Sequence, residues 1–228
     1  MVKIKTAGQS GQVLAHTCLP FAEAWDLQKN LVQERFLDRI PDTLILTQHE
    51  PIVTLGRTTK PEHWESNRHV LETARIALCQ IERGGSATYH GPGQIIGYPI
   101  LRLRTYCAGP KLYVQKLEEV LIRTLSEWDI SACRHERHRG VWVAGPETRM
   151  AKIASIGVRI VRGITMHGFA LNVNVDLQPY SLITPCGIDG CQVTSMAEVL
   201  SSQVDMKAVQ QAIIRRFSEV FGLPFLYP

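Results

Sequence analysis

The sequence has no long apolar run. No stretch approaches the roughly 18 consecutive apolar residues that a membrane-spanning helix needs, so we expect no membrane association. Residues 1–15 contain neither an apolar core with a cleavage site nor an Arg- and Ser-rich amphipathic pattern, so neither a secretory nor a transit peptide is evident. These absences favour a cytoplasmic enzyme or binding protein.

The sequence also lacks the dense cysteine pattern of a small secreted domain. Its six cysteines are spread over 228 residues, which indicates reduced thiols, most of them buried and perhaps one reactive. They are Cys18, Cys79, Cys107, Cys133, Cys186 and Cys191.

Charge is nearly balanced, and no basic stripe interleaved with aromatic residues is present. The formal net charge is +4, and the densest basic group is Arg134, Arg137 and Arg139. Without a basic stripe we expect no nucleic-acid partner, and the small positive excess favours acidic partners only weakly.

Ordinary globular composition predicts one domain over residues 1–228. Apolar residues make up 45% and charged residues 20% of the chain, and this length suits one well-buried core. Apolar spacing predicts helices after Pro20, after Gly109 and after Asp205. Strands are expected at 43–48, 52–56, 95–103, 141–143, 152–161 and 169–173, while 70–79 fits either helix or strand.

Strands that follow one another directly predict an α+β fold, not repeated βαβ units. Pro99 makes an interior ladder position less favourable at that point of its strand. The stretch 57–67 is expected to be a surface loop.

The segment from Arg83 to Gln94 is the most unusual in the chain, because it holds four glycines and a proline in twelve residues. Such a segment is kept for its backbone shape, and it fits a phosphate cradle, a catalytic-histidine loop or a wall against a ligand. The sequence has neither a Walker-type P-loop nor a clean G-x-G-x-x-G after a strand, so the phosphate reading lacks local support.

Two further groups of residues can carry chemistry. Cys133, His135 and His138 lie close in sequence, but their cationic surroundings and missing fourth ligand favour a solvated turn over a metal site. Cys186 lies between Pro185 and Gly187 in an irregular segment, which suits an accessible nucleophilic thiol. Lys152 heads an apolar strand and is a candidate partner, although spacing alone does not establish the pair.

Several long strings, in order, resemble the lipoyl(octanoyl) transferase family. They are Arg83-Gly84-Gly85, Thr88 to Gln94, Tyr98-Pro99-Ile100, Lys152 to Arg159, His167 to Asn174, Pro185 to Ile188 and Val193-Thr194-Ser195. Tyr180 and Thr184 depart from the residues common in that family.

The resemblance implies a fold like that of the biotin and lipoate protein ligases, with a mixed, largely antiparallel sheet flanked by helices. It implies transfer of an octanoyl group from acyl carrier protein to a lysine on a lipoyl domain. The acceptors would be the acyltransferase subunits of 2-oxoacid dehydrogenases and the glycine cleavage H protein, and no cofactor or metal is implied.

Carried over residue by residue, the resemblance makes Cys186 the acyl-accepting thiol and Lys152 its partner. It assigns contacts with the acyl group and the acceptor to Arg83, Gly84, Gly85, Ser86, Ala87, Thr88, Tyr89, His90, Ser155, Ile156, Gly157, Gly168, Phe169 and Ala170. Backbone N–H groups near Gly187 or Gly168 are two alternatives for the oxyanion donor.

Two other functions stay open at this point. A lipoate-protein ligase of the same fold would need ATP, and a non-catalytic protein that binds acyl carriers or lipoyl domains would need no reactive thiol. Transfer measured without ATP, before and after alkylation of thiols, distinguishes the three.

Overall fold

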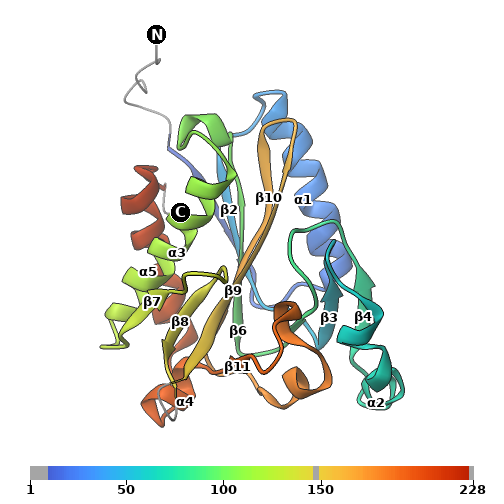
Figure 1. Cartoon of the computed structure of the whole chain (residues 1–228). Helices are drawn as coiled ribbons and strands as arrows, with labels where there is room; N and C mark the ends of the chain where they lie inside the picture. Colours follow the sequence, from blue (N-terminus) through green and yellow to red (C-terminus); the bar gives the residue numbers. More distant parts are fainter. Residues whose placement is uncertain (1–9, 146–148, 226–228) are drawn as a thin grey trace.

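A large twisted sheet divides the molecule and carries helices on both faces (Figure 1). The computed structural model describes residues 10–145 and 149–225, so most of the segment examined for a targeting signal lies outside it. The strand order in this sheet is β1-β2-β6-β10-β9-β8-β7, and β11 pairs with β9. None of the described helices combines the length and apolarity needed to cross a bilayer.

The large sheet is mixed and largely antiparallel. β1 is parallel to β2 and β11 is parallel to β9, while the other pairs are antiparallel. The strands are β1 (Gln12–Ala15), β2 (Thr43–Thr47), β6 (Gln94–Ile100), β7 (Ala132–Arg134), β8 (Val141–Ala144), β9 (Met150–Val161), β10 (Ile164–Asn172) and β11 (Gln192–Val193).

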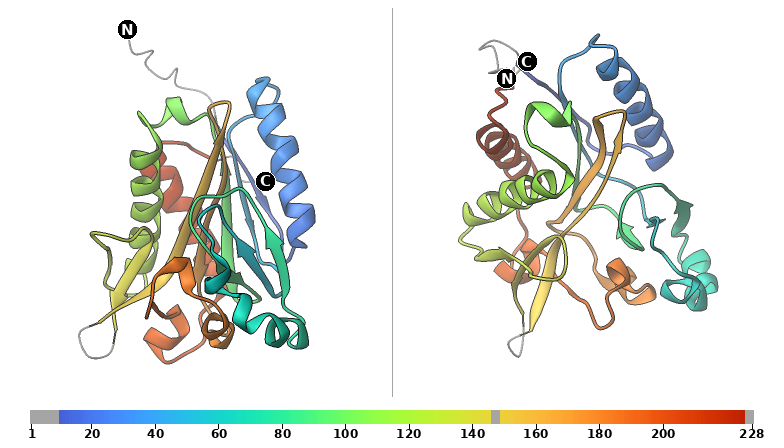
Figure 2. Two further views of the ribbon diagram at one scale, coloured as in Figure 1. Left: turned by 45° about the vertical axis from the view of Figure 1, so that its right-hand side comes forward. Right: turned by 45° about the horizontal axis from the view of Figure 1, so that its top comes forward.

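Helix α1 (Phe21–Phe36) covers one face of the sheet, and α3 (Pro110–Ser126) with α5 (Met206–Phe221) covers the other (Figure 2). Pro110 occupies the first turn of α3, where a missing N–H costs nothing. The Asp205 side chain caps α5, and Gly222 ends it in the left-handed conformation. All three predicted helices are confirmed, and their apolar stripes form two cores against the sheet.

A second sheet of order β4-β3-β5 lies beside the large one and consists of β3 (Ile52–Leu55), β4 (Ala77–Gln80) and β5 (Thr88–His90). The turn at 49–51 therefore carries the chain from one sheet to the other. The ambiguous stretch 70–79 divides between α2 (Arg68–Thr73) and β4. Each sheet contains one parallel pair of strands joined through a helix, β1-α1-β2 and β3-α2-β4. The order of predicted strands in the sequence did not indicate these two units.

Pro99 lies within strand β6 between β2 and β10, but it does not occupy an interior ladder position, as expected from the sequence. The ladder to β10 ends at the Gly97–Phe169 pair, and the Thr165 hydroxyl donates to the Pro99 carbonyl at 2.6 Å. Pro99 therefore has a ladder partner on one side only, the local situation that proline tolerates.

The remaining elements are short and lie mostly around one end of the sheets. They are η1 (Pro61–His63), η2 (Glu65–Asn67), η3 (Leu103–Thr105), η5 (Gln178–Leu182), η6 (Pro185–Gly187) and α4 (Met196–Leu200). The expected surface loop 57–67 thus contains two 3-10 turns. The His63 carbonyl accepts a bond from the Thr184 N–H at 2.7 Å, which ties this loop to η6.

Candidate active site

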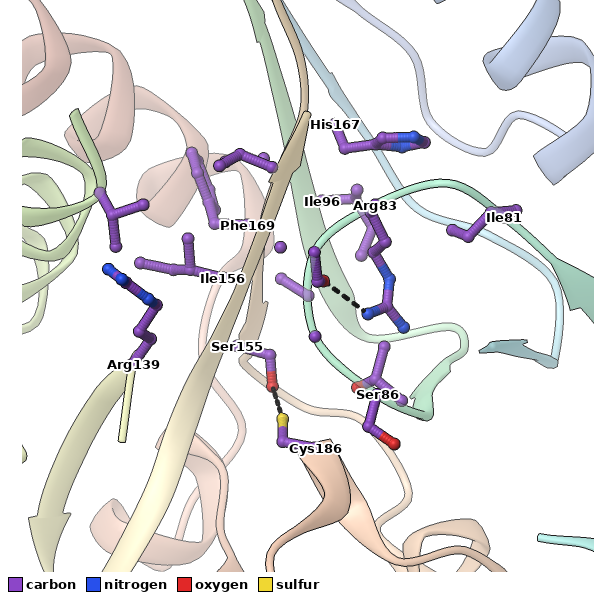
Figure 3. Close-up of a pocket in the computed structure, with 18 of the residues that line it drawn as sticks. Ile81, Arg83, Ser86, Ile96, Arg139, Ser155, Ile156, His167, Phe169 and Cys186 are labelled. Atoms are coloured by element: carbon purple, nitrogen blue, oxygen red, sulfur yellow. Dashed lines mark hydrogen bonds between the residues drawn. The ribbon is translucent and has the colours of Figure 1, made fainter. Parts of the chain in front are cut away.

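A cavity of about 390 Å³ lies where the two sheets meet, against β9 and β10 (Figure 3). Strand β5, the glycine-rich segment before it, β6 and η6 contribute the other walls. The sequence-predicted residues that line it are Arg83, Gly84, Gly85, Ser86, Thr88, His90, Lys152, Ser155, Ile156, Gly157, Gly168, Phe169, Ala170 and Cys186.

The Cys186 thiol points into this cavity from the 3-10 turn η6 (Figure 3). Its backbone is left-handed, with φ +58° and ψ 14°, a conformation that costs a non-glycine residue roughly 1–2 kcal/mol. The Cys186 N–H donates to the Ala87 carbonyl at 2.8 Å, so the glycine-rich segment holds this backbone in place. The Ser155 hydroxyl lies 3.8 Å from the Cys186 sulfur.

The other five cysteines do not line the cavity. Burial raises the pKa of the Cys79 and Cys107 thiols above their usual range. Cys191 follows Cys186 closely in sequence, and burial raises its pKa to about 11 despite the nearby Lys152 charge. A thiolate is therefore disfavoured at these three positions, which leaves Cys186 as the thiol placed for reaction.

Lys152 lines the same cavity and is almost fully buried, with 2% of its surface exposed. Its Nζ lies over the Trp142 ring, 4.8 Å from the centroid. Gly140 allows this approach: a Cβ there would lie 2.5 Å from the Ala154 carbonyl oxygen and 3.4 Å from Lys152 Cε. The Lys152 and Cys186 side chains line the same cavity and are not joined by a hydrogen bond.

Arg83 is a buried cation with no carboxylate partner among residues 10–145 and 149–225. Its guanidinium donates to the Thr54 carbonyl at 2.7 Å, to the Thr54 hydroxyl at 2.8 Å and to the Gly84 carbonyl at 3.1 Å. Burial lowers the pKa of Arg83, and the charge of Cys186 acts in the opposite direction. A buried arginine bonded only to neutral groups favours negative charge beside it.

A chain of buried hydrogen bonds links Arg83 to strand β10. The Thr54 hydroxyl donates to His90 Nε2 at 3.3 Å, and His90 Nδ1 donates to Gln94 Oε1 at 2.8 Å. The Gln94 amide donates to Asn172 Oδ1 at 2.8 Å. Burial, with help from nearby histidine and arginine charges, lowers the pKa of His90 to about 3. A group that binds a proton this weakly is a poor general base near pH 7, and this supports a positioning role for His90.

Gly157 allows the glycine-rich segment to lie directly on β9. The Gly84 N–H donates to the Val158 carbonyl at 3.0 Å. A Cβ on Gly157 would come within 2.9 Å of both the Gly84 carbonyl oxygen and Arg83 Cδ. A side chain at this position would push the wall of the cavity away from the sheet.

Part of the cavity lining is apolar and is formed by Phe21 and Ile81, with Tyr98 beside them. In the view of Figure 3, Ile81 lies apart from Cys186, with the Arg83 guanidinium between them. Phe21 and Ile81 pack together with Ile52, which stands behind them and does not line the cavity. We name Phe21 and Ile81 the end wall.

Two sequence-predicted contact residues, Ala87 and Tyr89, do not line the cavity. Side chains alternate along a strand, so Thr88 and His90 face the cavity and Tyr89 turns away. The Tyr89 ring packs against Tyr180, 5.6 Å between centroids, and burial raises its pKa. Of the two oxyanion donors considered, the Gly187 N–H is already bonded to the Thr184 carbonyl at 3.0 Å.

Sequence reasoning missed the end wall, Thr54, and the placement of Arg137, His138 and Arg139 along the same cavity. In the sequence, Phe21 and Ile81 are indistinguishable from ordinary apolar core residues. The basic cluster at 134–139 was visible as a charge group, but nothing local showed what it lies beside.

Known proteins resemble this chain in sequence and in fold. An octanoyltransferase of Rubrobacter xylanophilus is 42% identical over 207 residues, which cover 90% of this chain and 90% of that protein. A bipartite lipoate protein ligase from Thermoplasma acidophilum superposes with a TM-score of 0.71 at 17% identity, covering 97% of this chain and 87% of that one.

A biotin protein ligase from Aquifex aeolicus superposes with a TM-score of 0.54 at 13% identity, covering 92% of this chain and 68% of that one. The expected fold, a mixed sheet flanked by helices as in lipoate and biotin protein ligases, is confirmed. Residues 20–218 match the lipoyl protein ligase A/B catalytic domain, and the chain belongs to that family.

Proposed function

We propose that this chain moves an octanoyl group from the thioester of an acyl carrier protein to Cys186, and from Cys186 to the ε-amine of a lysine. The chain is an acyltransferase of protein lipoylation, as its octanoyltransferase relatives support. The acceptors would be lipoyl domains of 2-oxoacid dehydrogenase acyltransferase subunits and the glycine cleavage H protein. The observation that carries the proposal is a strained, cavity-facing thiol beside two buried cations.

The chemistry proceeds in two balanced steps. In the first, the Cys186 thiolate attacks the donor carbonyl, a C–S bond forms, and the carrier thiolate leaves and takes up a proton. In the second, the acceptor amine attacks the Cys186 thioester, a C–N bond forms, the C–S bond breaks, and the amine loses its proton. The first step exchanges similar thioesters and the second makes a more stable amide, so no ATP is consumed.

Positive charge around Cys186 supports both steps. Arg83 stabilises the thiolate and the tetrahedral oxyanion electrostatically, because its bonds go only to neutral acceptors. Lys152 is the group to which we assign the proton transfers: as a neutral amine it takes the thiol proton and passes it to the departing carrier thiolate. In the second step it takes the proton of the incoming amine and passes it to the released Cys186 thiolate. The small lining residues Gly84, Gly85, Gly157, Gly168 and Ala170 leave room for the alkyl chain.

The test is incubation with octanoyl-acyl carrier protein without ATP, followed by intact mass measurement. We expect one octanoyl mass on the wild type and on Cys191→Ala, the matched control, and none on Cys186→Ala. A stable thioester on Cys186→Ala would show that another thiol is the nucleophile. Lys152→Met should slow acylation by a hundredfold or more, and an unchanged rate would remove Lys152 from the mechanism.

The same assay addresses the alternatives. A lipoate-protein ligase would modify lipoyl domains only with free acid and ATP, and a binding protein would keep its function after iodoacetamide treatment. We further propose that one catalytic domain carries the reaction, since all cavity walls come from the two adjoining sheets and their connections. A cytoplasmic location suits it, because a reducing compartment keeps Cys186 as a free thiol.

A further inference from the structure

Within the part of the chain that the structure describes, the charged side chains along the cavity are all basic. They are Arg83, Arg137, Arg139 and Lys152, and none of the described aspartates or glutamates lines the cavity. The reacting atoms do not need this many cations, because an octanoyl thioester is neutral and a lysine acceptor is itself basic. Arg83 and Lys152 flank the nucleophile, so the function of the other two arginines is unassigned.

Arg137 and Arg139 belong to the loop between β7 and β8, and we name Arg137, His138 and Arg139 the rim. Both rim arginines are exposed to solvent and also line the cavity, which places them at its mouth. Arg139 is directed toward the cavity beside Ile156 in Figure 3. The rim therefore borders the path by which a reactant enters.

The guanidinium groups of the rim have no partner among the described residues, unlike that of Arg134 at the end of β7. Arg134 pairs with Glu119 at 2.7 Å and with Glu118 at 3.3 Å, both on α3. Arg137 and Arg139 make no ion pair or side-chain hydrogen bond within residues 10–145 and 149–225. Glu136, the acidic residue of the loop, lies outside the cavity lining.

Three rings pack against one another at tilted angles at the base of the rim. His135 and His138 lie 4.8 Å apart between centroids, and His135 lies 5.0 Å from Trp142, the ring beneath the Lys152 ammonium. Burial lowers the pKa of His138, and the charges of His135, Lys152 and Arg137 lower it further. His138 thus acts as a neutral spacer, and the rim's positive charge resides on the two arginines.

We propose that the rim binds the phosphate of the donor's prosthetic arm, an inference that rests on the octanoyl-carrier donor of the proposed function. An acyl carrier protein presents its thioester on 4′-phosphopantetheine, whose phosphate is the anion attached to the reacting group itself. Guanidinium groups bind phosphate oxygens in a bidentate manner, which fixes direction as well as affinity. The rim holds the arm while the thioester reaches Cys186.

The direct test measures binding of 4′-phosphopantetheine and of pantetheine by calorimetry, with Cys186→Ala protein so that no transfer intervenes. One charged hydrogen bond at an exposed site corresponds to about a tenfold effect. We expect the phosphate to tighten binding about tenfold, and Arg137→Gln/Arg139→Gln to abolish that preference. Arg134→Gln, the matched control, should keep it.

Single-turnover acylation of wild-type Cys186 by the octanoyl thioesters of the same two molecules gives the kinetic counterpart. The phosphorylated donor should react about tenfold faster at low concentration, and the double variant should react equally with both. Equal binding and equal rates in the wild type would overturn the proposal. Variants that keep the phosphate preference but slow with the whole carrier protein would also overturn it, since the rim would then meet acidic protein side chains.

Failure of the proposed function has a different signature. If octanoyl-carrier protein never acylates Cys186, the transfer mechanism is wrong, while the calorimetric comparison still confirms or overturns the phosphate site.

Discussion

We expect the end wall, Phe21 and Ile81, to determine which acyl chain length the cavity accepts. Ile81 has 3% of its surface exposed and lines the cavity, and it lies apart from Cys186 in Figure 3. Ile81→Ala removes three carbons from that wall and opens room for a longer chain. We expect this variant to shift its preference from octanoyl toward decanoyl donors.

The magnitude follows from burial of the extra methylenes. Each buried CH₂ is worth about 0.8 kcal/mol, or about fourfold in kcat/KM. A decanoyl chain has two more methylenes than octanoyl, so its kcat/KM relative to octanoyl should rise about 15-fold in Ile81→Ala over the wild-type ratio. The gain is largest if the new space stays open and smaller if Phe21 moves into it.

The assay mixes octanoyl- and decanoyl-carrier protein in equal amounts and reads the acyl masses on the enzyme by mass spectrometry. Ile52→Ala is the matched control, since Ile52 belongs to the same apolar cluster but does not line the cavity. Both variants should lose stability by about 2–5 kcal/mol. A ratio that stays within twofold of wild type in Ile81→Ala, or that rises equally in Ile52→Ala, refutes the assignment of the end wall.

Three other predictions concern the polar part of the site. Ser155→Ala should slow acylation less than tenfold in single-turnover kinetics, because its hydroxyl makes one long contact with the sulfur; a larger loss would give it a direct part in proton transfer. Thr54→Val should lower the free energy of unfolding in urea by about 1–3 kcal/mol, since it leaves Arg83 donors unsatisfied; an unchanged midpoint would contradict the buried network. Burial lowers the pKa of both His90 and His167 from 6.5 to about 3. Between these two pH values the unfolded chain therefore binds more protons at these histidines than the folded chain does. Their contribution to stability is complete above pH 6.5 and is lost as pH falls toward 3, and His90→Gln should reduce that slope by about 1.4 kcal/mol per pH unit; equal slopes from pH 6 to pH 4 would show that His90 is not buried neutral.

Local patterns in the sequence predicted the parts of the fold that depend on local physics. The stripe from Val114 to Leu125 and the proline before it define α3, and Asp205 with Gly222 delimits α5. The paired sheets escaped prediction, because the choice of partner for β3 depends on packing far along the chain. Pro99 followed local physics, since the β10 ladder ends at Gly97 and leaves Pro99 with a partner on the β2 side only.

For the site, the residue types in the sequence indicated which segments take part, but they did not indicate which way each side chain points. The irregular Pro-Cys-Gly turn marked Cys186, and the glycines before β5 marked a wall. Tyr89 was expected to line the cavity with Arg83, yet the strand geometry of 88–90 turns it toward Tyr180. The rim could not be placed from sequence, because pairing of β7, β8 and β9 brings Arg137 and Arg139 to the cavity mouth.

The left-handed backbone at Cys186 also determines what selection acting on stability alone would do to this site. Glycine would adopt φ +58° without strain and would keep the N–H bond to the Ala87 carbonyl. A laboratory selection for heat tolerance that ignores transfer would therefore reward loss of the nucleophile itself. The thiol survives at this position only under continuous selection for activity, so its presence in a relative of unknown role is itself an indicator that the relative still transfers acyl groups.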